Sequence, residues 1–479
     1  MSNYFTNIGR AVLGKSSNGQ SMQKLMQEAL VSLIGNKFTT YDAKGSTYVN
    51  NGYNENSTVY SVVSQASTKL ASVPNYLKKE KDKPSKLKHQ RLINLKGQLS
   101  TNDFAQKRIL ESKAYDQQEI NEPLEKPNFY QSWGEFYSLW HTFMLLNGNA
   151  YIYLVAPEDG MNKGQPMQVF LLPSQYVQIV LKSAYTQEDS LNIANAVESP
   201  IDYYILTIGN SYVQFKANKV IHTKFPNPNF DTSGSHLYGQ APLRAGLGDL
   251  KVSNDTNKQN IKTMQNGGNF GFIHGTDPNR ALTPEQAQSL KERLVEMSLD
   301  MTAMNRYSGT SLPVGFTKLS IDTKDLLPFE YLSHSAGEIC NVFSWPAELL
   351  AVNGQAKYDN MDVAWKMAIS NRIQPDLRIL QEALNDHYYP RFKGYEGVTK
   401  IFDTSELPEM QADMEKLTQW LKEAFDRGVI SPDEYRSALR YPEVGDDLMQ
   451  TRFIKQGYIP LSDVLLNENP LDDPETLKL

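Results

Sequence analysis

The chain has 479 residues, enough for about three folding units of roughly 150 residues each. Its apolar fraction of 40% and its charged fraction of 21% are ordinary for a water-soluble globular protein. The net charge is −6, whereas a protein that grips duplex DNA through its phosphates normally carries a basic face. Composition therefore argues against tight, sequence-reading DNA binding, but it permits a protein through which DNA merely passes.

Cysteine content and apolar runs indicate the compartment. Cys340 is the only cysteine, so neither an intrachain disulfide nor a cysteine-based zinc site can form, and we expect a buried thiol. The N-terminal sequence lacks the continuous apolar core of a secretory signal. The longest near-apolar run, Phe143–Ala156, is interrupted by Asn147-Gly148-Asn149 and is too short and too polar to span a bilayer. We expect a reducing compartment and no membrane segment.

The N-terminal part is expected to combine a polar arm with a helix and a strand. The arm is rich in Asn, Gly and Ser and contains one amphipathic candidate, Met22–Ile34. Residues 57–73 show the helical spacing of apolar side chains, with Ser57 or Thr58 as the N-cap. A short strand over Val73–Leu77 is expected to follow.

Residues 78–96 are unusually basic, with eight Lys or Arg residues and two acids. A charge run of this kind is most often the solvated face of a helical arm, which is the structure we expect here. A contact with nucleic acid or with a partner protein is the alternative.

The next block mixes helix and strand. Trp133–Leu146 has the pattern of an amphipathic helix, and Gly209-Asn210 between two apolar runs predicts a tight hairpin. Strand signals occur at Ala150–Val155, Val169–Leu172, Tyr176–Leu181, Tyr203–Ile208, Tyr212–Phe215 and Val220–Thr223. These features predict an α+β block whose sheet is antiparallel.

After Pro242 the chain is expected to turn helical. Residues 251–265 are so polar that they cannot form a core helix of a monomer, so they are solvent-exposed or pack against neighbouring subunits. A small β-α-β unit is expected to follow. Its predicted parts are a strand at Phe270–His274, a helix at Pro284–Met297 with Thr283 as N-cap, and a strand at Pro313–Leu319.

The stretch Glu338–Asn371 predicts a helix, an exposed loop and a second helix. The first helix begins near Leu326, tolerates Pro328 only in its first turn, and ends before Trp345-Pro346. The loop contains Asn353-Gly354, a turn dipeptide, and the second helix begins at Asp359. No catalytic constellation lies on this stretch.

The remaining helices have clear boundary signals. A break or kink is expected near Gln374-Pro375. A helical pair at Leu407–Arg427 and Pro432–Arg440 is expected, with Gly428 just past the first helix and Ser431 as N-cap of the second. The last 35 or so residues are rich in Pro and Asp and are expected to be extended.

One motif formally predicts chemistry. Gly9–Ser16 fits the G-x-x-x-x-G-K-S phosphate-binding loop, but that mechanism needs a buried strand immediately before it, and only eight residues precede it. The seven histidines show no i,i+4 pair and no HExxH motif, and no Gly-x-Ser-x-Gly elbow occurs. We therefore expect no catalytic, metal or cofactor site, and an assembly component is favoured over an enzyme.

Several segments, in order, resemble the portal (head-to-tail connector) proteins of tailed double-stranded DNA bacteriophages. They are Leu124–Asn128, Leu146–Ile152 followed by Gly160, Leu172-Pro173, Val220–His222, Tyr238–Leu243, Phe343–Leu350, Tyr358–Asn360, the helix around Pro375, and Gly428–Arg436. Each piece alone is weak, but their order and spacing over residues 57 to 445 are specific.

The resemblance implies an α+β portal-type subunit that assembles into a ring. The subunit would have a wing of mixed helix and antiparallel sheet, long stem helices, a small α/β clip and a helical crown. The implied divisions are an N-terminal arm (1–56), wing (57–239), first stem helix (240–266), clip (267–321), second stem helix (322–345), channel loop (346–358), wing and crown helices (359–404), crown helices (405–445) and C-terminal tail (446–479). The basic segment 78–123 is longer than the family's usual link.

The resemblance also implies a function without chemistry. A homo-oligomeric ring, usually a dodecamer, would occupy one capsid vertex of the virion after assembly in the host cytoplasm, and double-stranded DNA would pass through it non-specifically. Its partners would be the terminase large subunit, the head-tail adaptor, and the major capsid and scaffolding proteins. By position, Asn353, Gln355 and Lys357 would face the channel, while docking residues of the clip would be Phe270, Phe272, His274, Pro313 and Phe316. A P-loop NTPase or other DNA-packaging enzyme is the alternative.

Overall fold

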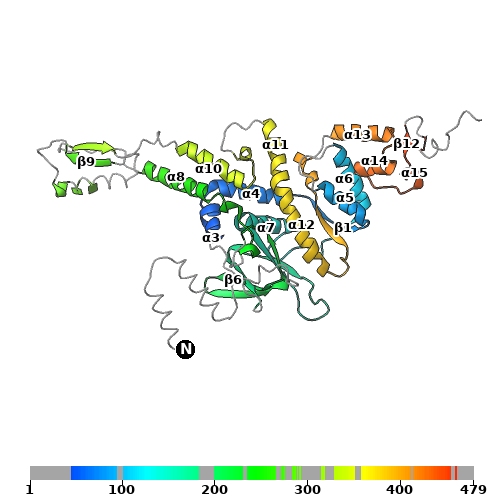
Figure 1. The fold of residues 1–479 in the computed structure, drawn as a ribbon, viewed down its shortest axis with the longest axis horizontal. Coiled ribbons are helices and arrows are strands. Elements are labelled where there is room, and N and C mark those ends of the chain that lie inside the picture. Colours follow the sequence, from blue (N-terminus) through cyan, green and yellow to red (C-terminus); the bar gives the residue numbers. More distant parts are fainter. Residues whose placement is uncertain are drawn as a thin grey trace, which may run out of the picture.

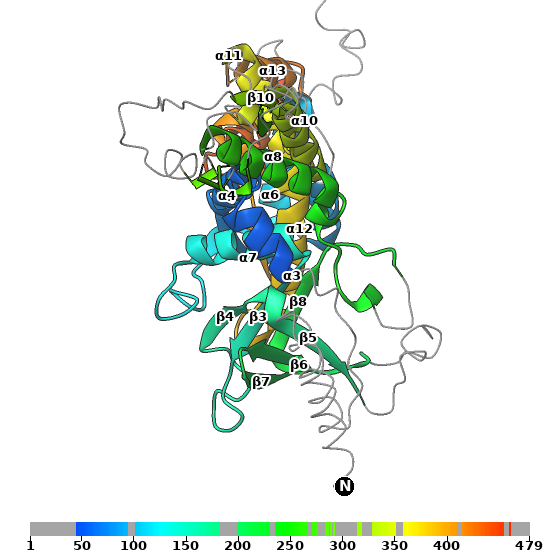
Figure 2. The same cartoon turned by 90° about the vertical axis from the view of Figure 1, so that its left-hand side faces the viewer.

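The subunit is elongated, with a helical body between two projecting ends (Figure 1). The computed structural model describes residues 45–93, 101–182, 199–229, 235–265, 271–275, 283–286, 288–289, 291–292, 314–318, 328–350, 358–410, 414–454 and 459–460. Strands β9 and β10 lie at one end, helices α13 to α15 lie at the other, and two sheets lie below the helices (Figures 1 and 2). The mixture of helix and antiparallel sheet confirms the predicted fold class.

Two helices form the centre of the body, as predicted. α4 spans Ser57–Ala71 and α7 spans Trp133–Asn147. The predicted N-cap of α4 was wrong by one residue, because Asn56 is extended and its side chain accepts hydrogen bonds from the backbone N–H of Thr58 and Val59. α7 begins with a capping box between Ser132 and Glu135 and ends at Gly148, whose φ of 70° favours glycine.

Two three-stranded antiparallel sheets lie beneath these helices, confirming the predicted strands and their direction. The first has the order β4-β3-β8, with β3 at Asn149–Val155, β4 at Gln168–Leu172 and β8 at Val220–Lys224. The second has the order β5-β6-β7, with β5 at Val177–Leu181, β6 at Ile201–Ile208 and β7 at Ser211–Lys216. The predicted hairpin joins β6 to β7, and Gly209 there has a φ of 60°.

A third antiparallel sheet contains part of the basic segment. Its order is β11-β1-β2, with β1 at Asn75–Glu80, β2 at Tyr115–Ile120 and β11 at Val398–Phe402. Between β1 and β2 the chain forms α5 (Lys83–Ile93) and α6 (Thr101–Ala114), which pack against each other. The expectation of a simply solvated arm was wrong, because the segment begins as a strand and buries His89.

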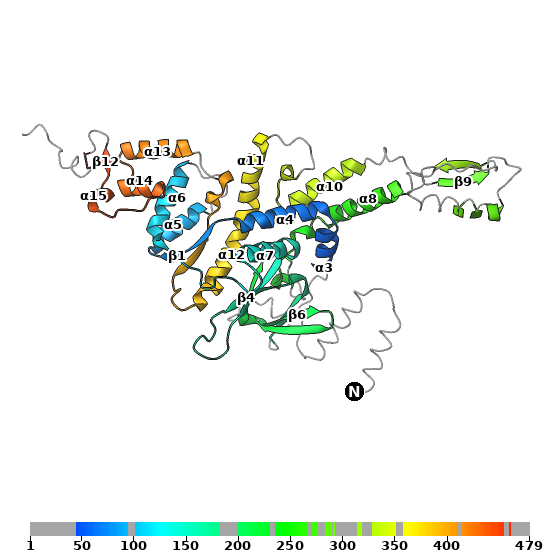
Figure 3. The ribbon, with the colours of Figure 1, turned by 180° about the vertical axis from the view of Figure 1, so that it is seen from behind.

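Two long helices project from the body side by side (Figure 3). α8 spans Leu247–Gln265 and α10 spans Pro328–Val342, so Pro328 lies in the first turn as required. Beyond them, β9 (Gly271–Gly275) and β10 (Val314–Lys318) pair antiparallel. Thr283 is an N-cap as predicted, because it exchanges hydrogen bonds with Gln286 at 3.2 and 3.4 Å.

The C-terminal helices follow the predicted order. α11 (Tyr358–Ala368) continues through one π-helical turn, η10 (Ile369–Ile373), into α12 (Gln374–His387), so the irregularity expected at Pro375 is a π turn. α13 spans Met414–Asp426 and α14 spans Pro432–Ala438. The predicted start of α13 at Leu407 was too early, because η12 (Thr404–Glu406) and η13 (Pro408–Met410) precede it.

The predicted extended tail also contains short elements, namely α15 (Asp447–Gln450) and the pair β12 (Phe453–Ile454) and β13 (Ile459–Pro460). The remaining short helices are α3 (Gly45–Thr47), η1 (Tyr48–Asn54), η2 (Ser174–Tyr176), η5 (Ala217–Lys219), η6 (Ser235–Leu237), η7 (Pro242–Arg244), η8 (Ala347–Leu349) and η11 (Tyr389–Arg391). Residues 461–479 lie outside the described part.

Candidate stem, clip and crown surfaces

The projecting helix α8 is joined to the body by one buried side chain. Asn56 donates through Nδ2 to Ser253 Oγ (3.0 Å) and Asn254 Oδ1 (2.8 Å), while its Oδ1 caps α4. Asn254 in turn donates to the carbonyl oxygen of Asn51 at 2.8 Å. Because Asn56 is only 2% exposed, losing it would leave several buried polar groups without a partner.

Beyond this joint, α8 is exposed on most sides. In residues 251–261 only Ser253 and Asn254 are buried, while Val252 and Ile261 are 45% and 55% exposed. The prediction that this helix is not part of a monomer core is therefore confirmed. Its inner side approaches α10 closely at its base, since a Cβ on Gly246 would lie 3.2 Å from Cγ2 of Val342.

Helix α10 is buried on its inner face through Ala336, Ile339 and Cys340, and Phe343 directly after it is buried as well. Burial raises the pKa of the Cys340 thiol to about 11, and the nearby Glu348 adds to the shift, so the thiol is protonated at neutral pH. The expected buried thiol is confirmed.

The two sides of the predicted channel loop are held together by aromatic side chains. The rings of Trp345, before the loop, and Trp365, after it, meet edge to face at 5.8 Å between centroids. Gln65 of α4 accepts a hydrogen bond from Trp345 Nε1 at 3.3 Å and donates to the carbonyl oxygen of Leu349 at 3.4 Å. The loop therefore starts and ends on a fixed base.

The candidate site residues are only partly covered by the described chain. The channel-loop residues Asn353, Gln355 and Lys357 lie outside it, as do the clip residues Phe270 and Pro313. The other clip residues lie on the paired strands, with Phe272 opposite Thr317, His274 opposite Gly315, and Phe316 opposite Ile273. Their roles therefore stay predictions.

The body contains a buried Ser-His-Asp arrangement between α4, α7 and α12. No sequence motif pointed to it. His141 Nε2 donates to Asp376 Oδ2 at 2.7 Å, Ser67 Oγ lies 3.3 Å from Nδ1, and Arg372 forms a bidentate pair with Asp376 at 2.6 and 2.5 Å. Burial lowers the pKa of His141, so the ring is neutral. The three residues of this arrangement are at most 2% exposed, so they are out of reach of a substrate. Their hydrogen bonds instead connect α4 and α7 to α12.

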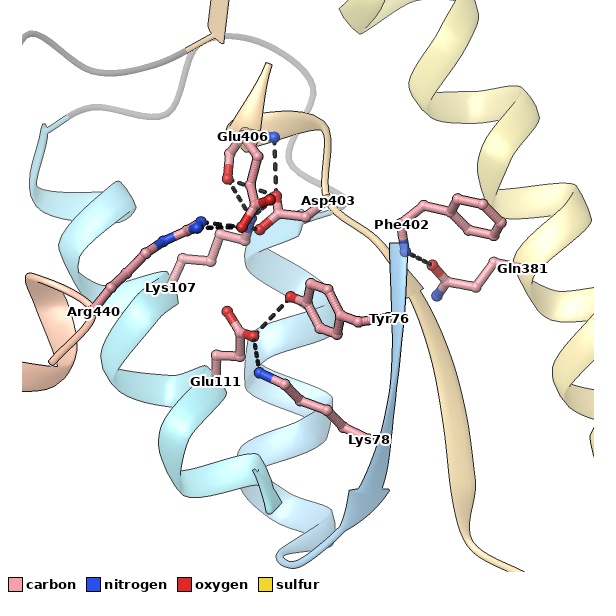
Figure 4. Close-up of polar contacts among 10 residues, drawn as sticks. Tyr76, Lys78, Lys107, Glu111, Gln381, Phe402, Asp403, Glu406 and Arg440 are labelled. Carbon is pink, nitrogen blue, oxygen red and sulfur yellow. Dashed lines mark hydrogen bonds and ion pairs between the residues drawn. The ribbon is translucent and has the colours of Figure 1, made fainter. Parts of the chain in front are cut away.

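Buried charges join the basic segment to strand β11 and its following turn (Figure 4). Lys107 of α6, only 4% exposed, pairs with Asp403 at 2.5 Å and donates to Ser405 Oγ at 2.8 Å. Burial alone would raise the pKa of Asp403, but Lys107 and the hydrogen bonds from Ser405 lower it to about 2. Arg440, just after α14, pairs with Glu406 beside this group.

The other face of α6 packs against the C-terminal helices. Ala105 and Ile109 share a small apolar cluster with Leu417 and Leu421 of α13 and with other residues near α14. Arg108 also donates to the carbonyl oxygen of Ala438 at 2.7 Å. The basic segment is therefore a bridge between the body sheet and the C-terminal helices, a role that neither of its sequence interpretations included.

A family model described as phage portal protein matches residues 57–439, which is well over half of the chain. The chain belongs to the phage portal protein family. Its function is that of a portal protein, the component that occupies one vertex of the capsid.

An uncharacterized protein of Rickettsia bellii (strain RML369-C) is 24% identical over 328 residues, which are 68% of this chain and 79% of that protein. An uncharacterized protein of Rickettsia felis (strain ATCC VR-1525 / URRWXCal2) is 25% identical over 300 residues, 62% of this chain and 72% of that protein.

Solved structures resemble the portal subunit along most of its length. The neck of a native GTA particle, computed with C12 symmetry, matches with a TM-score of 0.55 and 19% identity over 85% of this chain and 96% of that chain. The virion of a native gene transfer agent (GTA) particle matches with a TM-score of 0.54 and 19% identity over 87% of this chain and 99% of that chain. These likenesses concern the fold and confirm that it is of the portal type.

The described part of the portal subunit contains neither a metal-binding cluster nor a membrane-spanning helix. Within the described residues, no group of three or more His, Cys, Asp or Glu side chains is placed to hold a metal ion. In that same part of the chain, no helix combines the length and apolarity needed to cross a membrane. The formal P-loop match at Gly9–Ser16 lies outside the described residues.

Proposed function

We propose that this portal protein assembles into a ring around a channel through which the phage genome is packaged and later ejected. The observation that carries the proposal is α8, which projects from the body with polar side chains on most sides and exposed Val252 and Ile261. Such a helix gains burial when copies stand side by side around an axis. The ring would contain twelve copies, by analogy with the C12 symmetry used for the similar GTA neck.

The ring would also use helix α11, which follows the predicted channel loop. Val363 and Met367 lie one helical turn apart and are 55% and 51% exposed. Two adjacent exposed apolar side chains are typical of a surface that contacts another protein. We infer that they contact the neighbouring subunit, beside the axis toward which the loop would point.

We further propose that Asn353, Gln355 and Lys357 face the DNA. The tryptophan contact at the base of the loop supports this, because a fixed base lets a short loop keep its position while DNA moves past it. One lysine per copy supplies few phosphate contacts, and few contacts permit sliding. Replacing the three residues by Ala should leave rings intact but reduce the amount of DNA in filled heads; unchanged filling contradicts the assignment.

The finer divisions follow the same template. We propose the following functional regions: wing (57–239), stem helices (240–266 and 322–345), clip (267–321), channel loop (346–358), wing and crown helices (359–404) and crown helices (405–445). The clip, with Phe270, Phe272, His274, Pro313 and Phe316, would dock the terminase large subunit and later the head-tail adaptor. The major capsid and scaffolding proteins would contact the wing in the host cytoplasm, before the finished virion forms.

The competing proposal, a P-loop NTPase or other packaging enzyme, rests on the formal motif at Gly9–Ser16. We propose that the protein is not an enzyme. Purified protein should therefore show no nucleotide turnover above the rate of the Lys15→Ala variant, measured by phosphate release. Turnover that Lys15→Ala abolishes would favour the enzyme.

Particle mass tests the ring itself. A closed ring gives a single dominant mass that is an integer multiple of 54.2 kDa and does not change on dilution within hours. A mass of one subunit at every protein concentration and ionic strength contradicts the proposal.

A further inference from the structure

One face of the β5–β6–β7 sheet is apolar, and the neighbouring sheet covers only part of it. On this face Val177, Ile179 and Tyr204 are buried against Tyr151 and other residues of the neighbouring sheet. The same face continues along β6 and β7 through residues that are increasingly exposed, because side chains two apart on a strand share a face. The neighbouring sheet therefore leaves one end of this face exposed to solvent.

The uncovered part can be located from the strand register. Val177, Leu206 and Val213 lie in one row across the three strands, and Ile208 lies beyond Leu206 on the same face. Val213 is 52% exposed and Ile208 is 53% exposed, whereas Val177 is 1% exposed. We call Ile208 and Val213 the open end of the sheet.

The N-terminal arm enters the described fold at this end. α3, the first described helix, begins at Gly45 and contacts η2, the short helix that leads directly into Val177 of β5. Val177 is in the same row as Val213. Gly45, where the described chain begins, therefore lies near the open end. Within the described part of the chain, β7 has no strand on its outer edge.

The arm contains a segment whose chemistry matches an open apolar surface. Within Met22–Ile34 the apolar residues recur every three or four positions, and Gly35-Asn36 marks the end of the pattern. The apolar positions on this face are Met22, Leu25, Met26, Ala29, Leu30, Leu33 and Ile34, while Val31 lies on the other side. A helix of this pattern has one continuous apolar face, which needs a partner surface.

The connecting length suits a contact within one subunit. Residues 35–44 separate the segment from Gly45 and can span up to about 33 Å when extended. A tether this short gives an effective concentration in the millimolar range, which favours the chain's own segment over one from another copy.

We propose that residues 22–34 form an amphipathic helix that covers the open end of the β5–β6–β7 sheet of the same subunit. The proposal does not depend on ring formation, because the segment and the surface belong to one chain. It assigns the N-terminal arm the role of completing the wing.

Hydrogen exchange of the full-length protein tests the contact. In the wild type, backbone amides of residues 22–34 should exchange at least tenfold more slowly than in an unstructured peptide of that sequence. The Ile208→Glu/Val213→Glu variant should lose most of that protection while α7 keeps its own. The matched control is Val429→Glu/Val444→Glu, which changes two similarly exposed valines elsewhere and should leave residues 22–34 protected. Absent protection in the wild type, or equal protection in both variants, overturns the proposal.

Crosslinking decides which subunit provides the segment. Cys340 is 1% exposed, so a Leu30→Cys/Val213→Cys variant offers a bismaleimide only two accessible thiols. The proposal predicts a product of one-subunit mass on a denaturing gel. Covalent dimers, or no crosslink, contradict it, and Leu30→Cys/Val429→Cys should give no crosslink within one subunit.

Discussion

At the scale of single residues, Asn56 illustrates how one side chain can connect local and distant structure. It caps α4 and holds α8, almost 200 positions later, through Ser253 and Asn254. Helix α4 is predictable from its apolar spacing, but Ser57 or Thr58 was the predicted cap, since Asn, Ser and Thr all suit that position. Only the fold shows which of them is extended and faces the projecting helix.

Asn56→Ala should destabilise the subunit by about 1–3 kcal/mol, because it removes a helix cap and leaves buried polar groups of α8 without a partner. Urea unfolding measures the change. Ser57→Ala, at the exposed neighbouring position, is the control and should stay within about 0.5 kcal/mol of the wild type. Equal effects of the two substitutions contradict the assigned cap.

His89 should make the subunit less stable in mild acid. Burial is the main cause that lowers its pKa to about 4, and neither ring nitrogen has a hydrogen-bond partner among the described residues. The pKa of His89 is about 4 in the folded chain and about 6.5 in the unfolded chain. At pH values between these two, the unfolded chain therefore binds one proton more than the folded chain. The contribution of this residue to stability is therefore complete above pH 6.5 and falls as the pH decreases toward 4.

His89→Phe should remove this part of the acid sensitivity, on the order of 2–3 kcal/mol between pH 7 and pH 4. At pH 7 its unfolding free energy should equal or exceed that of the wild type, because no hydrogen bond is lost. Urea midpoints at several pH values measure both effects. His334→Phe changes an exposed histidine and should keep the wild-type pH dependence; if both variants keep it, the account of His89 is wrong.

At the scale of elements, most helices and strands were predictable, and the bridge formed by α5 and α6 was not. Strands such as β3 and helices such as α7 carry apolar periodicity that matches their burial. In the bridge, charged residues occupy inside positions, and Lys107 is buried because Asp403, almost 300 positions away, neutralises it. A sequence pattern records neither that pairing nor the π turn that precedes Pro375.

Lys107→Met should therefore destabilise the subunit by about 3–5 kcal/mol, since it leaves the buried Asp403 carboxylate without its nearest cation. The double variant Lys107→Met/Asp403→Leu should be destabilised by less than the sum of the single changes. Urea unfolding of the three variants gives the coupling. Lys216→Met, which disrupts an exposed pair with Glu158, is the control and should produce no measurable change. Additive effects would contradict a coupled, buried bridge.

At the scale of the whole molecule, the candidate site is a set of surfaces that become complete only in an assembly. The polar character of α8 could be read from the sequence, because it depends on residue types. The pairing of β9 with β10, the contact between Trp345 and Trp365 and the joint at Asn56 could not be read from it, since each depends on contacts between distant segments. The open end of the β5–β6–β7 sheet was not predictable from the sequence for the same reason.

Electron microscopy of the purified full-length protein shows directly whether the subunits form a ring. We expect ring-shaped particles with an axial hole and about twelvefold symmetry in end views. Side views should show a stem that narrows toward the end bearing β9 and β10. Single subunits, or compact particles without an axial hole under all conditions, would contradict it.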